Sequence, residues 1–354
     1  GSLDTTFGGG DGIVVTPVGT SDDVANAIVR RTDGRLLVVG QTFNGSDTDV
    51  ALVQLTSTGA FDVAFGGGDG IATSGLAGYD EGYDVALQAD GRILVASQSS
   101  TNLQVVRFNA DGTRDSTFGT GGLVEVDVAS GNDRTYAIAL DADGRILLAG
   151  SAVVGPNVDI VVVRLTDAGV LDTSFNGTGK VTVDIGTSSS DTGYAMTLQP
   201  DGRILVAGWS DAPGSTQFAV IRLTAGGSLD TTFGGDGTIT VDVGTSSGSK
   251  LALDVVVQPD GRILVGGTGN SNGNNLGVVR LTAAGALDQS FGGGDGIVET
   301  TISTYSDERA QALALQADGR IVVAGTTNAP GNYDLLVARY TASGAIDVAV
   351  GAIT

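Results

Sequence analysis

The chain has 354 residues, a formal net charge of −22, and neither cysteine nor histidine. Without these two residue types, disulfides, thiolate or imidazole metal sites, and catalytic triads or dyads built on histidine are excluded. Forty acidic against 18 basic side chains would repel phosphate backbones and anionic lipids, so we expect no nucleic-acid partner. Hydrophobic residues make up 41% of the chain, enough for a buried core, and this predicts a globular protein.

No apolar run approaches the roughly 20 residues that a membrane-spanning helix needs, so we expect no direct membrane insertion. The chain opens with Gly1-Ser2 rather than with methionine, which leads us to expect a part of a larger polypeptide. Its acidic, cysteine-free composition is typical of secreted or cell-surface proteins of bacteria, and we expect that localisation.

Three signatures recur along the chain. Asp-Gly-Arg is followed at once by an apolar run such as LLVVG or ILVAG, and a second apolar run ends in arginine, except in the first repeat, which has Gln54. The third signature is Leu-Asp-x-x-Phe-Gly, whose last copy is degraded to IDVAVG. The aspartates of the first signature are Asp33, Asp90, Asp143, Asp201, Asp260 and Asp318. The closing arginines are Arg107, Arg164, Arg222, Arg280 and Arg339, and the aspartates of the third signature are Asp4, Asp62, Asp115, Asp172, Asp230, Asp288 and Asp347.

Each repeat is predicted to contain four strands and no helix. In the second repeat these are 70–74, 83–88, 93–97 and 103–109, with tight Asp-Gly turns after the second and the fourth. Residues 93–96 are apolar at every position, which is typical of a central strand covered on both faces. Repeated four-stranded sheets of about 58 residues predict an all-β fold, a six-bladed β-propeller.

We expect one domain over 1–354, with blades at approximately 8–64, 65–117, 118–174, 175–232, 233–290 and 291–346. Two other repeat folds fit less well. A parallel β-helix uses shorter repeats, and a calcium-binding β-roll needs Gly-Gly-x-Gly-x-Asp, whereas runs such as Gly8-Gly9-Gly10-Asp11 lack that spacing.

Taken together, LDxTFGxxG, DGRILVAG and VxRLTxxG closely resemble the bacterial delta-60 repeat family, and the resemblance covers essentially the whole chain. It implies a propeller-like repeat domain of large secreted or surface-associated proteins. It carries no catalytic residues that could be transferred to this sequence.

The repeated residues are expected to be structural. The Asp-Gly-Arg turn and the Leu-Asp crossover should fall at the same end of the propeller, where the arginine of one would pair with the aspartate of the other and lock adjacent blades. The phenylalanine of the crossover would plug the seam between blades, at Phe7, Phe65, Phe118, Phe175, Phe233 and Phe291. The first and last crossover copies compete for one site at ring closure, and we expect the N-terminal copy to occupy it.

The loops at the opposite end differ in every repeat, and function is expected there. Setting aside the repeated charges leaves 27 acidic against 7 basic groups on the variable surface. Carboxylates beside exposed aromatic rings suit the binding of a sugar, which stacks on the ring. The candidate ligand-binding residues are Trp209, Asp211, Tyr79, Asp80, Tyr305, Asp307 and Tyr333. Alternatively these loops are solubilising turns.

A further set lies nine residues beyond each repeat phenylalanine: Thr16, Ser74, Asp127, Asp184, Asp242 and Thr300. All six carry oxygen, and on the expected innermost strand they would ring one mouth of the central channel. Asp127, Asp184 and Asp242 are the candidate metal ligands, and Ca²⁺ suits such oxygen ligands. Alternatively each side chain accepts hydrogen bonds from its own turn. No cofactor is required by either interpretation.

Three functions remain open. The leading hypothesis is a non-catalytic binding or adhesion module of a secreted bacterial surface protein, with a glycan or protein ligand on another cell or surface. The second is a structural spacer or protein-interaction domain of a larger fibre protein. The third is a glycan lyase or hydrolase that uses paired carboxylates such as Asp80 and Glu81 or Asp307 and Glu308.

Overall fold

The computed structural model describes residues 2–98, 101–129, 131–212, 214–246, 248–271, 273–302, 307–328 and 332–347. Its contacts divide the chain into two compact units, one of Ser2–Gly155 with Val161–Val181, the other of Pro156–Ile160 with Thr182–Thr354. Among the described residues, no helix has the length and apolar character needed to cross a bilayer.

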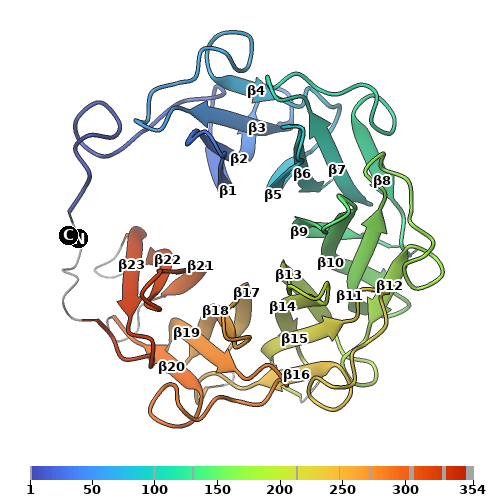
Figure 1. The fold of residues 1–354 in the computed structure, drawn as a ribbon, viewed down its shortest axis with the longest axis vertical. Helices are drawn as coiled ribbons and strands as arrows, with labels where there is room; N and C mark the ends of the chain where they lie inside the picture. The colour runs from blue at the N-terminus through green and yellow to red at the C-terminus, as the bar shows by residue number, and fades with distance from the viewer. Residues whose placement is uncertain are drawn as a thin grey trace. The chain divides into compact units, whose positions relative to one another are not determined.

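The described strands form six antiparallel sheets (Figure 1). The first sheet contains β1 (Asp23–Arg30), β2 (Leu36–Phe43), β3 (Thr48–Leu55) and β4 (Ile71–Thr73). The second contains β5 (Glu81–Leu87), β6 (Ile93–Gln98), β7 (Leu103–Phe108) and β8 (Leu123–Val126). The third contains β9 (Arg134–Leu140), β10 (Ile146–Val154), β11 (Asn157–Leu165) and β12 (Lys180–Val183).

The fourth sheet contains β13 (Asp191–Leu198), β14 (Ile204–Ser210), β15 (Gln217–Leu223) and β16 (Thr238–Val241). The fifth contains β17 (Leu251–Val257), β18 (Ile263–Asn270), β19 (Asn274–Leu281) and β20 (Ile297–Thr300). The sixth has three described strands, β21 (Arg309–Leu315), β22 (Ile321–Thr327) and β23 (Asp334–Tyr340). The all-β fold and the repeated, mostly four-stranded sheets confirm the expected fold class.

Five short strands follow the crossovers from Phe65 to Phe291, namely β4, β8, β12, β16 and β20. The sequence predicts that each opens the next sheet, but each closes the preceding one. β4 pairs with β3, with Ala51 opposite Thr73. The reason is the tight turn of the crossover: the Gly70 N–H donates to the Phe65 carbonyl oxygen at 3.0 Å, and both Gly66 and Gly70 adopt positive φ. The chain therefore folds back along the strand it has just left, and the observed sheets are out of phase with the expected blade boundaries.

Apolar side chains between neighbouring sheets of one unit form the core. The central strands β6, β10, β14 and β18 are buried over most of their length, as their continuous apolar runs predict. Clusters of buried side chains join the first sheet to the second, the second to the third, the fourth to the fifth, and the fifth to the sixth. Each sheet is therefore stabilised by its neighbours rather than by a core of its own.

Candidate metal centre and binding loops

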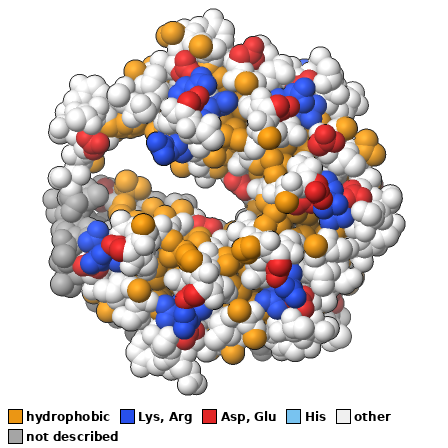
Figure 2. All heavy atoms as spheres, in the orientation of Figure 1, with side chains coloured by type: hydrophobic (Ala, Val, Ile, Leu, Met, Phe, Trp, Pro, Cys, Tyr) orange, Lys and Arg blue, Asp and Glu red, His pale blue; other side chains and the backbone are white. Residues whose placement is uncertain are grey.

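The repeated charged residues form the ion-pair network that the sequence predicts. In all six repeats the arginine of Asp-Gly-Arg reaches the aspartate of the following crossover, at nitrogen–oxygen distances from 2.7 Å for Arg35–Asp62 to 3.9 Å for Arg145–Asp172. This pair lies within one repeat, so it does not itself lock neighbouring sheets. In the sixth repeat Arg320 and Arg339 pair with Asp347, so the C-terminal crossover copy occupies this site and the expectation that the N-terminal copy does so is wrong. Figure 2 shows Lys or Arg side chains directly against Asp or Glu side chains at several separate places on the visible face.

The closing arginine is the residue that reaches the next sheet. Arg107 donates to Asp115 of its own repeat and to the carbonyl oxygen of Asp167 in the next, both at 2.8 Å. The same guanidinium lies over the Phe118 ring, 4.2 Å from its centroid. Phe65, Phe118, Phe175, Phe233 and Phe291 are fully buried, whereas Phe7 is half-buried. In the second to fifth repeats the closing arginine, the crossover aspartate and the phenylalanine therefore make structural contacts.

A second repeated feature lies at the other end of the sheets, ten residues before each Asp-Gly-Arg aspartate. The residues at this position are Asp23, Asp80, Asp133, Asp191, Lys250 and Glu308. From the second repeat onward, each of these side chains is 0 to 2% exposed. A charged group buried to this degree needs a partner of opposite charge or a bound ion, or its pKa shifts so that it becomes neutral.

Two further repeat positions accompany each of these buried side chains. One lies five residues before the end of the second apolar run, and the other is the position nine residues beyond the phenylalanine. We call the three side chains a seam triad. The described triads within one unit are Asp49, Ser74 and Asp80; Asn102, Asp127 and Asp133; Asp159, Asp184 and Asp191; Gln217, Asp242 and Lys250; and Asn275, Thr300 and Glu308.

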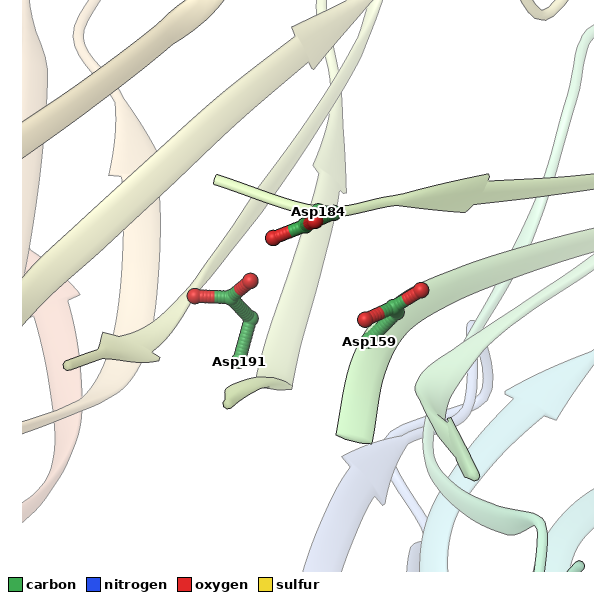
Figure 3. Close-up of side chains that lie close together, drawn as sticks. All are labelled: Asp159, Asp184 and Asp191. Carbon is green, nitrogen blue, oxygen red and sulfur yellow. The ribbon is translucent and has the colours of Figure 1, made fainter. Parts of the chain in front are cut away.

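The third triad is the one made of three carboxylates. Asp159 lies near the start of β11, Asp184 directly follows β12, and Asp191 begins β13. Their ligand oxygens lie within 4.8 Å of one another, and Figure 3 shows the three side chains converging. Among the described residues, this is the only group of three carboxylates close enough to share a metal ion.

Burial defines the electrostatics of this triad. Asp191 is 0% exposed and Asp159 is 6% exposed, whereas Asp184 is open to solvent. Burial raises the pKa of both Asp159 and Asp191, and the negative charge of Asp184 raises each further. None of the three forms an ion pair with a lysine or arginine in the described part of the chain. The triad therefore brings together three acidic groups that no described basic side chain neutralises.

The predicted metal ligands fall into three different triads. Asp184 belongs to the carboxylate triad, and it also accepts hydrogen bonds from its own turn, from the Ser188 N–H at 3.3 Å and the Ser189 hydroxyl at 2.9 Å. Asp242 contacts the ammonium of Lys250. The Asp127 carbonyl oxygen accepts a hydrogen bond from Lys180. All three follow an edge strand, β8, β12 or β16, and not the innermost strand that the expected ring requires.

Asp159 and Asp191 are not among the metal ligands predicted from the sequence. A signal for them is nonetheless present in the sequence. The position five residues before the end of the second apolar run is an acidic or amide residue in every repeat, and the position ten residues before the Asp-Gly-Arg aspartate is charged in every repeat. These positions alone do not show that the three chain segments lie side by side, because that depends on how the strands pair.

The structure brings some of the predicted ligand-binding residues together and separates others. Tyr333 is 62% exposed, and its hydroxyl donates to Asp307 at 2.8 Å. Asp307 also accepts from the Asn274 amide at 2.6 Å, so an aromatic ring, a carboxylate and an amide lie together on one surface. Tyr305 lies outside the described residues.

The remaining candidates are less favourably placed for a ligand. Tyr79 is exposed and its hydroxyl contacts Glu81, but Asp80 beside it is buried. Trp209 lies within β14, half-buried, with its indole N–H 3.3 Å from the Tyr194 hydroxyl. Asp211 is exposed and accepts a hydrogen bond from the Ser190 N–H at 2.7 Å.

The six repeats match a family model described as "Domain of unknown function (DUF5122) beta-propeller", at 31–65, 88–118, 142–175, 199–233, 258–291 and 316–349. A solved structure of an unknown function protein from Dyadobacter fermentans DSM 18053 is 13% identical, with 90% of this chain and 94% of that chain covered and a TM-score of 0.56. No curated protein matches the sequence.

A polysaccharide lyase of family PL25, an ulvan lyase, is 11% identical, with 90% of this chain and 79% of that chain covered and a TM-score of 0.52. At such identity these likenesses show the fold alone. The family matches together span more than half of the sequence. The chain therefore belongs to the DUF5122 β-propeller family and is a six-bladed β-propeller.

Proposed function

We propose that this protein is a non-catalytic binding or adhesion module of a secreted bacterial surface protein. The resemblance of its repeats to the delta-60 repeat family supports the secreted or surface localisation and the membership of a larger polypeptide. The repeats supply a rigid scaffold of buried strands and ion pairs. The loops at the far end of each sheet from the Asp-Gly-Arg turns differ from repeat to repeat and would carry the ligand.

The observation that carries the proposal is the surface formed by Tyr333, Asp307 and Asn274. The ring of Tyr333 is exposed, while its hydroxyl is fixed by the hydrogen bond to Asp307. Asp307 is itself fixed by Asn274 and contacts Arg309. An aromatic ring held in one orientation beside polar groups suits the apolar face and the hydroxyls of a sugar. The net charge of −22 favours a neutral glycan over an acidic one.

The arrangement of the carboxylates is the reason for a non-catalytic role. Glycosidases need two carboxyl groups that face each other across the bond to be cleaved. Asp80 is buried while its neighbour Glu81 contacts the hydroxyls of Tyr79 and Tyr83. In the other candidate pair, Glu308 is buried and Asp307 is partly exposed. Adjacent residues in extended chain point to opposite faces, so neither pair can flank one bound sugar.

A glycan array with neutral and acidic oligosaccharides, probed with the full chain, tests the proposal. We expect binding to neutral glycans, lost in Tyr333→Ala and weakened in Tyr333→Phe, which keeps the ring but not the bond to Asp307. Tyr79→Ala is the matched control, because Tyr79 is also exposed and also bound to a carboxylate through its hydroxyl.

Three results would count against the proposal. Loss of binding in Tyr79→Ala but not in Tyr333→Ala would move the site to another loop. Absence of binding to any glycan, together with no protein ligand retained on an affinity column, would favour the structural spacer. Release of unsaturated or reducing ends from any polysaccharide would favour a lyase or hydrolase.

A further inference from the structure

The third seam triad is a candidate for a ligand because its charge is uncompensated. Asp159 and Asp191 are buried, their carboxylates lie with that of Asp184, and no described basic side chain pairs with them. Ionised carboxylates in such surroundings repel one another and are poorly solvated. A structure that keeps three of them together needs a positive charge among them or a proton on at least one.

A second observation is a buried oxygen of Asp191 without a donor. One oxygen of Asp80, Asp133 and Glu308 is in the same situation, but among the described residues only Asp191 has two further carboxylates beside it. Asp191 is fully buried, and its Oδ2 accepts from the Ile185 N–H at 2.8 Å and from the Ser189 hydroxyl at 3.1 Å. Its Oδ1 is buried and has no hydrogen-bond partner. A buried oxygen without a donor costs free energy unless something else occupies its lone pairs. In Figure 3 one oxygen of this carboxylate lies on the side facing Asp184, and the ligand oxygens of Asp159, Asp184 and Asp191 lie within 4.8 Å of one another.

The next repeat supplies a comparison within the same chain. Lys250 occupies the repeat position of Asp191, and its ammonium contacts Asp242, the counterpart of Asp184. Gln217, a neutral side chain, occupies the position of Asp159. The fourth triad thus contains its own cation, the Lys250 ammonium, on a side chain that is only 2% exposed. The third triad instead has the carboxylates of Asp191 and Asp159 at the positions of Lys250 and Gln217.

We propose that Asp159, Asp184 and Asp191 bind one divalent cation, with Ca²⁺ as the preferred ion. Three carboxylates supply hard oxygen ligands, and a spread of 4.8 Å among the ligand atoms suits Ca–O distances of about 2.3–2.6 Å. Because Asp184 is open to solvent, water can complete the irregular coordination that Ca²⁺ accepts. Mg²⁺ demands near-octahedral geometry and is the less favoured ion. This inference is independent of the glycan-binding surface.

The first experiment compares the thermal unfolding of the full chain in EDTA, in CaCl₂ and in MgCl₂, with calorimetric titration of Ca²⁺. We expect one Ca²⁺ per chain and a midpoint raised by about 3–5 °C at Ca²⁺ concentrations near 100 times Kd, with a smaller effect of Mg²⁺. Terbium gives a second measurement, because Trp209, the only tryptophan, adjoins Ser210, the cross-strand partner of Asp191. Excitation of Trp209 should sensitise Tb³⁺ emission, and Ca²⁺ should compete it away.

Three variants locate the site. Asp159→Asn and Asp191→Asn should abolish the Ca²⁺-dependent shift and the Tb³⁺ emission. Asp191→Lys places a lysine where the fourth triad has Lys250, so the variant should be insensitive to Ca²⁺ and should unfold at a higher temperature in EDTA than the parent chain. Asp242→Asn is the control and should retain the shift, because Asp242 lies with Lys250 and not in this triad.

Two results would overturn the proposal. One is the absence of any Ca²⁺ or Tb³⁺ binding by the parent chain. The other is a shift that survives in Asp159→Asn and Asp191→Asn but is lost in Asp242→Asn, which would instead favour a ring of Asp127, Asp184 and Asp242. If an asparagine variant fails to fold, Asp191→Lys and the terbium titration of the parent chain still decide the question.

Discussion

Arg31 and Gln54 have exchanged places relative to the other repeats. Gln54 stands where every later repeat has its closing arginine, and it donates to Asp62 at 2.8 Å, as those arginines do to their own aspartates. Arg31 stands where most later repeats have glutamine. Its Nη2 lies 3.4 Å from the carbonyl oxygen of Ala110, which is the repeat counterpart of the Asp167 carbonyl bound by Arg107. The first repeat thus keeps the contact to the next repeat, but the arginine that makes it follows β1 instead of lying near the end of β3.

This exchange predicts strong coupling between the two positions. Arg31→Gln should destabilise the protein by about 1–2 kcal/mol, because the contact to the Ala110 carbonyl is lost. Gln54→Arg alone should also destabilise it, because two guanidiniums would compete for one buried space. The double variant recreates the arrangement of later repeats and should recover most of the loss. Denaturant unfolding of the four proteins measures the coupling, and additive effects would contradict it.

Asp230 should contribute stability through two arginines. Its Oδ2 accepts from Arg203 and Arg222, each at 2.8 Å, and its Oδ1 from the Thr232 hydroxyl at 2.7 Å. The hydrogen bond from Thr232 and the nearby arginines lower its pKa to about 2. Because the folded pKa lies below the ordinary value of 3.8, this stability is present above pH 3.8 and is lost as the pH falls toward 2.

We therefore expect Asp230→Asn to lower the free energy of unfolding by about 2 kcal/mol at pH 7, with the difference shrinking toward pH 2. The control is Asp201→Asn, which removes the exposed partner of the same Arg203 and should change stability by less than about 1 kcal/mol. Equal effects of the two variants would argue against a special role for the buried pair.

Asp80 should behave in the opposite way. Burial, together with the neighbouring charge of Asp49, raises its pKa to about 6. Its folded state therefore holds a proton more tightly than the unfolded state does, so stability falls as the pH rises from about 4 through 6. Asp80→Asn should raise the free energy of unfolding by about 2–3 kcal/mol at pH 7.5 and leave it almost unchanged at pH 4. Thermal or denaturant unfolding at the two pH values measures this, and a pH-independent effect would contradict it.

Phe65 should be one of the residues on which the first two sheets most depend. It is fully buried, and a Cβ added to Gly112 of the next repeat would lie 2.8 Å from its ring, so the two are in close contact. Phe65→Ala should cost about 3–5 kcal/mol because of the cavity it leaves. Phe61→Ala, four residues earlier on a partly exposed ring, should cost about 1 kcal/mol. Denaturant unfolding measures both changes in the free energy of unfolding. Similar values for the two variants would show that the packing between the first two sheets tolerates the cavity.

Much of the local structure could be predicted from the sequence because it is decided by residues close along the chain. The Asp-Gly turns, the buried central strands and the reach of each Asp-Gly-Arg arginine to the crossover aspartate all follow from turn chemistry and apolar runs. The sequence pattern did not predict which sheet the short strand after each crossover joins. Whether residues 71–73 pair forward or backward depends on the tight turn from Phe65 to Gly70, and the apolar pattern of a short strand is the same in either case.

The sequence alone determined the number of repeats and the approximate positions of their strands. It also determined that the residue nine positions beyond each repeat phenylalanine, Asp184 among them, carries a side-chain oxygen. Only the tertiary structure decided which side chains Asp184 meets. Asp159 precedes it by 25 residues and Asp191 follows it by 7, and the pairing of β12 with β11 and the packing of β13 bring the three together. A carboxylate cluster depends on distances of a few ångströms between side chains, and those distances are fixed by strand pairing rather than by separation along the chain.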